Sequence, residues 1–180
     1  MSEQTEVLKM VAQRLDRGNI PYMVSGSMAV NYYAQPRMTR DIDLVVELKD
    51  NDVENLIHLF EEDCYIDAES VREAIAHCGI FNTIHQDSLV KVDFIVRKES
   101  PYRKEEFRRR CKVDIEGTKV WFVQAEDLIL SKLLWAKDSH SESQLGDVQN
   151  VMRSTQELDR DYLDRWAREL DVRDLLEEAS

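Results

Sequence analysis

Apolar residues at helical spacing open the chain and dominate its last third. The first such pattern covers residues 5 to 17 and stops at Gly18 and Asn19, just before Pro21. The same periodicity predicts further helices at 28–33, 51 to about 60, 70–77, 125 to about 137, 142–153, 159–169 and 171–178.

Between these helices lie short runs rich in β-branched and apolar residues, which favour strands. Strands are predicted at 22–24, 41–46, 79–85, 89–96, 112–115 and 118–123. Residues 86–88 and 116–117 are turn-forming segments, and each of them joins two neighbouring predicted strands into a hairpin. The pattern predicts an α+β fold, with a mixed sheet flanked by helices.

The chain has 180 residues, the size of one domain, or of a core with a helical extension. We predict a core domain at 1–124 and a helical C-terminal region at 125–180 that packs on it. Hydrophobic residues at 43% and charged residues at 33% indicate a globular protein. The apolar runs are too short to cross a membrane, and the polar N-terminus lacks a secretory signal, so we expect a cytoplasmic protein without a membrane partner.

The formal net charge of −12 would repel a phosphate backbone, which argues against broad nucleic-acid binding. One stretch, residues 102–112, is basic overall. Two interpretations of it stay open: a binding patch, and a solvated helix face on which glutamates support arginines at helical spacing.

Cysteine and histidine are scattered without metal-ligand spacing, so neither a disulfide framework nor a zinc site is predicted. The tryptophans Trp121, Trp135 and Trp166 fall within strand or helix patterns, and we expect them to be packing anchors in the core or between its parts.

Two carboxylates stand two residues apart in the predicted strand at 41–46. Because side chains alternate along a strand, Asp41 and Asp43 project to one face while Ile42 and Leu44 point into the packing. Like charges on a half-buried strand repel, so a cation is expected between them. Magnesium suits such oxygen ligands.

Asp93 interrupts the apolar strand at 89–96 and is the natural third carboxylate. Buried without a partner, it would cost roughly several kcal/mol of desolvation. Taken alone, it fits equally well an edge strand on which Asp93 faces water.

A Gly-Ser turn lies upstream, where Ser25, Gly26 and Ser27 join a predicted strand to a predicted helix. Backbone N–H groups at a helix start can hold an anion such as a triphosphate. Such turns are common, and this one gains meaning only from the aspartates that follow it.

Together, Gly26-Ser27, Asp41-Ile42-Asp43 and Asp93 resemble the motif of the polymerase-β-like nucleotidyltransferases. Residues 37–46 look especially similar to the minimal bacterial members related to the AbiEii toxin group, and the resemblance covers about residues 5 to 135. It implies the mixed nucleotidyltransferase sheet, an NTP donor, and two Mg²⁺ ions, with Mn²⁺ as the alternative, held by Asp41, Asp43 and Asp93.

Four further residues are candidates around this site. Arg37 and Arg40 precede the metal strand, where a guanidinium would neutralise phosphates or stabilise Asp41, against the alternative of a solvated loop. Lys132 matches the family's phosphate-facing lysine, against the alternative of a surface lysine on an amphipathic helix. Asp147 resembles a further polar position of AbiEii-like members.

The function that the resemblance implies is transfer of an NMP from an NTP to an acceptor hydroxyl, with release of pyrophosphate. Gly26, Ser27 and Lys132 would hold the triphosphate, while the acceptor stays open among an RNA end, a protein and a small molecule. The alternative is a catalytically quiet component of a toxin–antitoxin pair that acts by binding a protein partner. A phosphohydrolase is disfavoured because the His-Asp metal pairs typical of that class are missing.

Overall fold

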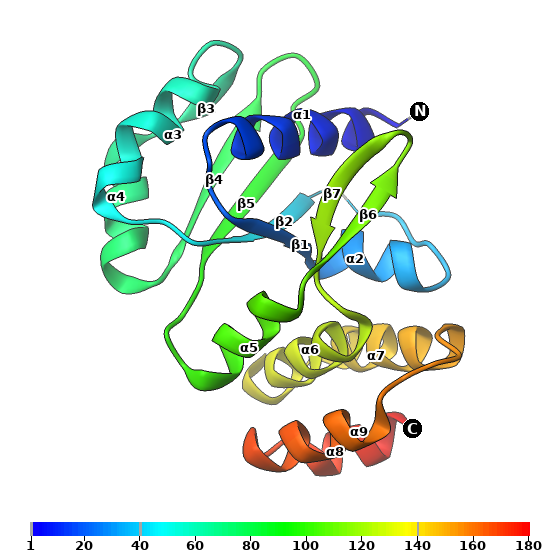
Figure 1. The fold of residues 1–180 in the computed structure, drawn as a ribbon. Helices are drawn as coiled ribbons and strands as arrows, with labels where there is room; N and C mark the ends of the chain where they lie inside the picture. Colours follow the sequence, from blue (N-terminus) through cyan, green and yellow to red (C-terminus); the bar gives the residue numbers. More distant parts are fainter. Residues whose placement is uncertain (1, 40, 140) are drawn as a thin grey trace.

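A mixed seven-stranded sheet forms the centre of the molecule in the computed structural model, which describes residues 2–39, 41–139 and 141–180 (Figure 1). The strand order is β3-β4-β5-β2-β1-β7-β6. β2 is parallel to β5 and antiparallel to β1, so the sheet combines both kinds of pairing. The strands are β1 (Tyr22–Ser25), β2 (Asp41–Val46), β3 (Cys64–Ile66), β4 (Ile80–His85), β5 (Lys91–Val96), β6 (Cys111–Ile115) and β7 (Thr118–Phe122).

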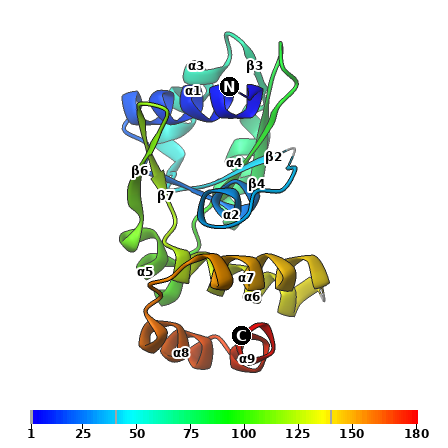
Figure 2. The same cartoon turned by 90° about the vertical axis from the view of Figure 1, so that its right-hand side faces the viewer.

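Helices cover both faces of this sheet. On one face lie α1 and α3 with α4 beside α3, and on the other lie α2, α5 and α6 (Figures 1 and 2). The helices are α1 (Glu3–Arg17), α2 (Gly26–Tyr33), α3 (Val53–Phe60) after the 3₁₀ turn η1 (Asp50–Asp52), α4 (Ala68–His77), α5 (Pro101–Arg109), α6 (Ala125–Ser139), α7 (Glu142–Ser154), α8 (Arg160–Glu169) and α9 (Arg173–Ala179).

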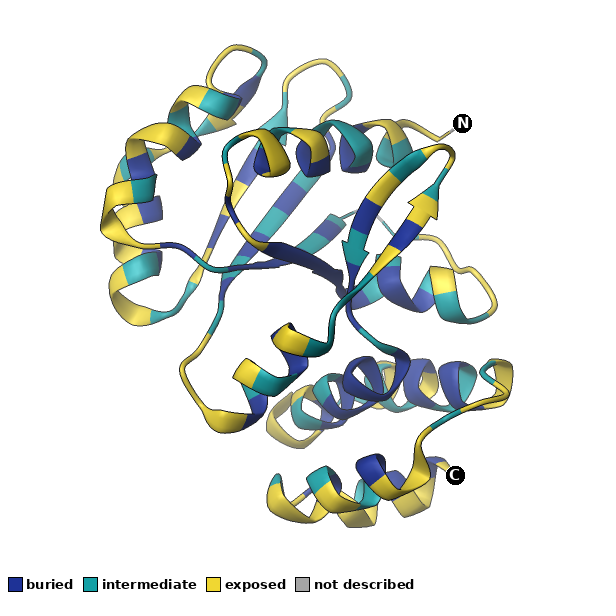
Figure 3. Ribbon diagram, viewed as in Figure 1, coloured by how far each residue is buried: buried dark blue, intermediate teal, exposed yellow. Residues whose placement is uncertain are grey.

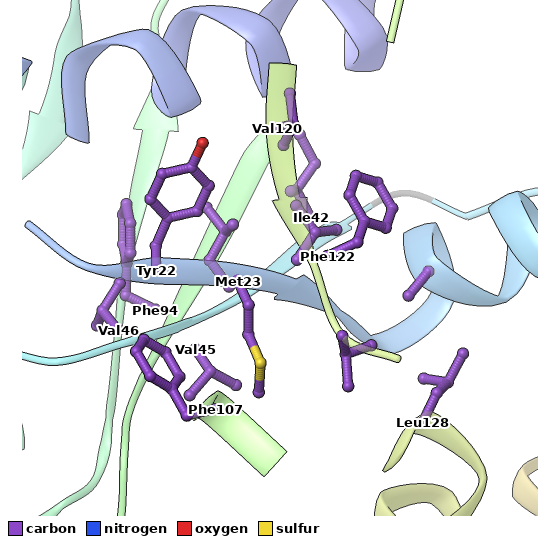
Figure 4. Close-up of a cluster of buried hydrophobic side chains, with 14 of the residues drawn as sticks. Tyr22, Met23, Ile42, Val45, Val46, Phe94, Phe107, Val120, Phe122 and Leu128 are labelled. Atoms are coloured by element: carbon purple, nitrogen blue, oxygen red, sulfur yellow. The ribbon is translucent and has the colours of Figure 1, made fainter. Parts of the chain in front are cut away.

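Alternation along the central strands divides the core into two layers. Tyr22 and Met23 are neighbours in β1, yet they point to opposite sides of the sheet, Tyr22 toward α1 and Met23 toward α5 (Figure 4). Val45 of β2 points to the same side as Met23, toward Phe107 of α5. The odd-numbered positions of β2 and β5 therefore face the side that carries α2, α5 and α6.

α6 is the helix on which the C-terminal part is built. It is buried on nearly every side, and α7, α8 and α9 pack beneath it while their outer faces stay exposed (Figure 3). Asp127 at its start is fully buried, accepting hydrogen bonds from the Tyr162 hydroxyl at 2.6 Å and from Arg109 Nε at 2.8 Å. The Arg109 guanidinium also lies over the Tyr162 ring, 3.7 Å from its centroid. This cluster ties α5, α6 and α8 together.

The predicted α+β class, with a mixed sheet, flanking helices and C-terminal helices, is confirmed. The three-residue strand β3 was missed because it is too short to show an alternating pattern. Trp135 was expected to be a packing anchor, but its residue surface is 48% exposed. None of the described helices combines the length and apolar character needed to span a bilayer.

The basic stretch at 102–112 forms α5 and the start of β6, and much of its charge is neutralised within the chain. Arg103 pairs with Glu106, Arg108 with Glu105, and Arg109 with Asp127. The structure thus favours the helix-face interpretation over a nucleic-acid patch.

Burial raises the pKa of Asp127 to about 6, against the lowering effect of its hydrogen bonds to Tyr162 and Arg109. A folded-state pKa above the ordinary value means that the folded protein favours the protonated form, so stability is highest at low pH and is lost as pH rises from about 4 to about 6. Across this pH window we expect the free energy of unfolding of the wild type to fall by about 3 kcal/mol relative to that of Asp127→Asn, as measured by urea unfolding. Tyr162→Phe should extend the decline to higher pH, and parallel pH profiles for wild type and Asp127→Asn would contradict the expectation.

Candidate active site

Three aspartates lie side by side on one face of the sheet because β2 and β5 pair in parallel with a fixed register. Asp43 pairs with Asp93, and Asp41 pairs with Lys91. Ile42 and Leu44, which alternate with the carboxylates along β2, are fully buried on the other face. Since β5 lies between β4 and β2, Asp93 is not on an edge strand, and that alternative is wrong.

Gly26 lies directly against the central carboxylate. In β1, Ser25 pairs with Asp43, and Gly26 follows with a φ of +57° to begin α2. A Cβ at Gly26 would lie 1.9 Å from Asp43 Oδ2 and 2.8 Å from Asp43 Cβ. The Ser27 backbone N–H donates a hydrogen bond to Asp43. The Gly-Ser turn therefore positions Asp43.

Asp43 has a pKa above its ordinary value. Burial is the main cause and the negative charge of Asp93 adds to it, while the Ser27 hydrogen bond and the positive charge of Lys132 act in the opposite direction. The ionised form of Asp43 is thus destabilised by its surroundings, and additional positive charge beside it would stabilise it.

A lysine compensates the two outer carboxylates. Lys91 Nζ lies 2.9 Å from Asp93 Oδ2 and 3.5 Å from Asp41 Oδ2. These interactions, led by the Asp93 hydrogen bond, raise the pKa of Lys91. Sequence analysis missed this residue, although its signal was present: Lys91 and Asp93 are two apart in a strand and so share a face.

Arg37, Lys132 and Asp147 form a second polar cluster beside the Gly-Ser turn. The Asp147 carboxylate accepts two hydrogen bonds from Arg37 at 2.8 Å and one from Lys132 Nζ at 2.8 Å. Arg37 also donates to Ser27 Oγ at 2.9 Å. Burial alone would raise the pKa of Asp147, but the bonds from Arg37 and Lys132 outweigh it and the pKa is lowered.

The two side chains of the Lys132–Asp147 pair are only 5% and 6% exposed. Lys132 is therefore not the surface lysine of the alternative interpretation, and its charge reaches Asp43. Asn31 holds the Arg37 backbone, donating to the carbonyl at 2.8 Å and accepting from the N–H at 2.9 Å. Arg37 is thus anchored in the cluster, while Arg40 lies outside the described residues.

Within residues 2–39, 41–139 and 141–180, no three His, Cys, Asp or Glu side chains form a group that could hold a metal ion as they stand. Asp41, Asp43 and Asp93 share a face and a fixed register, with the Lys91 ammonium between the outer two. The three aspartates supply carboxylate oxygens as ligand atoms, and the positive charge beside them is the Lys91 ammonium.

The sequence matches the family described as "Nucleotidyltransferase of unknown function (DUF6036)" over residues 2–145. No curated protein matches the sequence at a significant level.

Several solved structures share the fold. An antigenic nucleotidyltransferase-like protein from Paracoccidioides brasiliensis is 19% identical, with 98% of this chain and 91% of that chain covered and a TM-score of 0.63. ANT(2'')-Ia in complex with adenylyl-2''-tobramycin is 14% identical, with 96% and 99% covered and a TM-score of 0.60. The lincosamide antibiotic adenylyltransferase LnuA, bound to lincomycin, is 11% identical, with 86% and 99% covered and a TM-score of 0.55.

Gly26→Ala should displace Asp43, because the added methyl group meets the Asp43 side chain down to its Cβ. We expect Asp43 to lose the Ser27 hydrogen bond, and stability to fall by about 1–3 kcal/mol from the contact and the positive φ together. Urea unfolding and a crystal structure of the variant measure these effects. Gly117→Ala is the matched control, since Gly117 has a φ of +85° but open space around its Cβ position. Equal losses in the two variants would mean that backbone strain alone matters at Gly26.

Proposed function

Since the chain belongs to the family of nucleotidyltransferases of unknown function, we propose that it transfers an NMP from an NTP to an acceptor hydroxyl and releases pyrophosphate, with Mg²⁺ as its metal. The observation that carries the proposal is the in-register row of Ser25, Asp43 and Asp93, with Gly26 packed against Asp43. This row brings the Gly-Ser turn after β1, the Asp-x-Asp strand β2 and the Asp93 strand β5 together at one place.

The donor set fits a hard divalent cation. Asp41, Asp43 and Asp93 offer only oxygen ligands, and Lys91 lies where a cation compensates the outer carboxylates. We propose that these three aspartates hold Mg²⁺, with Mn²⁺ as a substitute, and that Lys91 swings aside when they do. When bound, the metal neutralises phosphate charge and lowers the pKa of the attacking hydroxyl.

The transfer exchanges one bond at the α-phosphorus for another, and a side chain of the protein takes up the proton. The acceptor oxygen forms a bond to the α-phosphorus of the NTP, the bond from that phosphorus to the bridging oxygen of the β-phosphate breaks, and pyrophosphate leaves. The proton of the hydroxyl passes to Asp93, which is 19% exposed and carries the carboxylate nearest Lys91.

The triphosphate is assigned to the start of α2 and the cationic cluster beside it. Arg37 is 44% exposed while it holds Asp147, so one edge of its guanidinium is accessible to a phosphate oxygen. Lys132 is buried, and its role is to lend positive charge to the Asp43 side of the site. Arg40 is retained as a phosphate ligand on the sequence argument alone.

The neighbours' names support a small-molecule acceptor as one branch of the proposal, because one is bound to lincomycin and another to adenylylated tobramycin. The catalytically quiet toxin–antitoxin component remains the second candidate. The observation that favours it is that the three carboxylates do not form a ready metal group and that two of them, Asp41 and Asp93, are already paired with Lys91. The relation to AbiEii-like members stays a prediction.

Calorimetric titration of each NTP with Mg²⁺ separates these candidates. We expect the wild type to bind one NTP in a Mg²⁺-dependent way and Asp41→Asn/Asp43→Asn to lose that binding, because the metal ligands are gone. Asp50→Asn/Glu54→Gln removes the same charge from an exposed site and should bind as the wild type does. Binding that survives in the first double variant, or the absence of binding for every NTP, would favour the quiet component.

Lys91→Met should strengthen Mn²⁺ binding roughly tenfold, because an ammonium that competes for two carboxylates at about 3–4 Å is removed. Electron paramagnetic resonance of free Mn²⁺ measures the affinity. Lys119→Met, which removes an exposed ammonium paired with Asp114, should leave it unchanged. Weaker binding in Lys91→Met would show that Lys91 supports the metal site rather than competing with the metal.

A further inference from the structure

An apolar floor continues the carboxylate row along the face of the sheet that carries α2, α5 and α6. Two residues beyond Asp43 on β2 is Val45, and two beyond Asp93 on β5 is Ile95, so both share the aspartates' face. The register pairs Val45 with Ile95, and Ile95 with Ile80 of β4. This floor lies about 7 Å from the carboxylates, one pleat further along the strands.

The floor is partly open. Ile80 is 59% exposed, an unusual state for isoleucine in a sheet, and Ile95 is partly exposed. Together with α5 and α6 it bounds a cavity of about 380 Å³, which Ser25, the partner of Asp43, also lines. The cavity therefore adjoins the candidate active site. A second cavity, of about 490 Å³, is lined by residues of α6, α7, α8 and α9 and by none of the residues of that site.

The wall opposite the floor is supplied by α6. Trp135, 48% exposed, and Leu134 line the cavity, giving it an aromatic surface across from Ile80 and Ile95. A flat, partly exposed tryptophan beside aliphatic side chains is a typical surface for an aromatic or aliphatic ring. Nothing in the packing of the core needs Trp135 to be so exposed.

The two arginines that line the cavity are paired with carboxylates, while Lys98 and Asp138, which also line it, are exposed and opposite in charge. Arg97 pairs with Glu47 and Glu99 at 2.9 Å, and Arg103 pairs with Glu106 at 2.8 Å. Glu106 is 1% exposed and also accepts a hydrogen bond from the Ser131 hydroxyl. The cavity therefore offers no free arginine for a polyphosphate backbone, and the single lysine and single aspartate left in its lining offset each other in charge.

From the floor, the tryptophan wall and the paired charges, we infer that this cavity is the acceptor subsite and that the acceptor is a small molecule with an uncharged, aromatic or aliphatic body and a hydroxyl group. This inference rests on the proposed function for its chemistry. The apolar body lies on Val45, Ile80 and Ile95 under Trp135, which directs the hydroxyl along the strands to Asp93. A volume of about 380 Å³ suits a ligand of that kind.

The test begins without nucleotide or metal, on protein with ¹³C-labelled isoleucine methyl groups. We expect 2-phenylethanol and indole-3-ethanol to shift the methyl signals of Ile80 and Ile95 saturably, while Ile42, fully buried on the other face, serves as the internal reference. Trp135→Ala should weaken this binding roughly fivefold, because an aromatic contact is lost. Tyr65→Ala removes another exposed aromatic, 63% exposed on β3 away from the cavity, and should change nothing.

Adding Mg²⁺ and the NTP chosen by calorimetry tests the two proposals separately. Mass spectrometry should then detect the NMP ester of the alcohol. Methyl shifts without NTP binding would leave the cavity as a binding site for apolar alcohols, and would sink the nucleotidyltransferase proposal together with the acceptor role that rests on it. NTP binding with no shift from either alcohol, or with tetrauridylate shifting Ile80 and Ile95 in their place, would overturn the inference and leave the nucleotidyltransferase proposal intact.

Discussion

The in-register pairing of β2 with β5 is the constraint on which the rest of the site depends. If β2 slipped by one residue along β5, Asp41 and Asp43 would turn toward the helices α1 and α3. Ile42 and Leu44 would then lie on the face that carries α2, α5 and α6. The register is secured by the buried positions that flank the carboxylates along the two strands, since Ile42, Leu44, Val92 and Phe94 are all fully enclosed. The core thus fixes the geometry of the chemistry, and Gly26 can approach Asp43 only because that geometry is fixed.

Two kinds of charge compensation surround the carboxylates, and they differ in how easily a ligand could replace them. Lys91 is 37% exposed and makes its contacts at the edge of the site, so rotating it away exposes the ammonium to water at little cost. Lys132 and Asp147 are buried as a pair, and separating them would leave an uncompensated buried charge. We therefore regard Lys91 as the movable partner, and the Arg37–Asp147–Lys132 cluster as a fixed part of the site that shapes the field at Asp43.

The sequence was sufficient for the parts of the site that are local. The Asp-x-Asp spacing, the Gly-Ser turn and the lone Asp93 each have a period or a turn type that can be recognised in a few residues. It was insufficient where the structure depends on distant pairing. Arg37 meets Asp147 across 110 residues, and Trp135 and Ile80 line one cavity that no periodicity encodes. For the same reason the basic stretch at 102–112 stayed ambiguous until its carboxylate partners, some on α6, were located.

On the face of the sheet that carries α2, α5 and α6, the strand pattern fixes where the side chains beyond the aspartates point but not what they are. Alternation requires only that the residues two positions beyond the aspartates face the same side as the aspartates, and it places no demand on what they are. Here they are Val45 and Ile95, and the neighbouring Ile80 is left exposed although burial would stabilise it by roughly 1.5–3 kcal/mol. Val45 is buried and Ile95 is partly buried, so Ile80 is the exposed end of the row, and an apolar group bound in the cavity would cover it. A ligand whose apolar body lies on this row would cover Ile80. The same ligand would bring its hydroxyl to Asp93, because the row lies next to the aspartates.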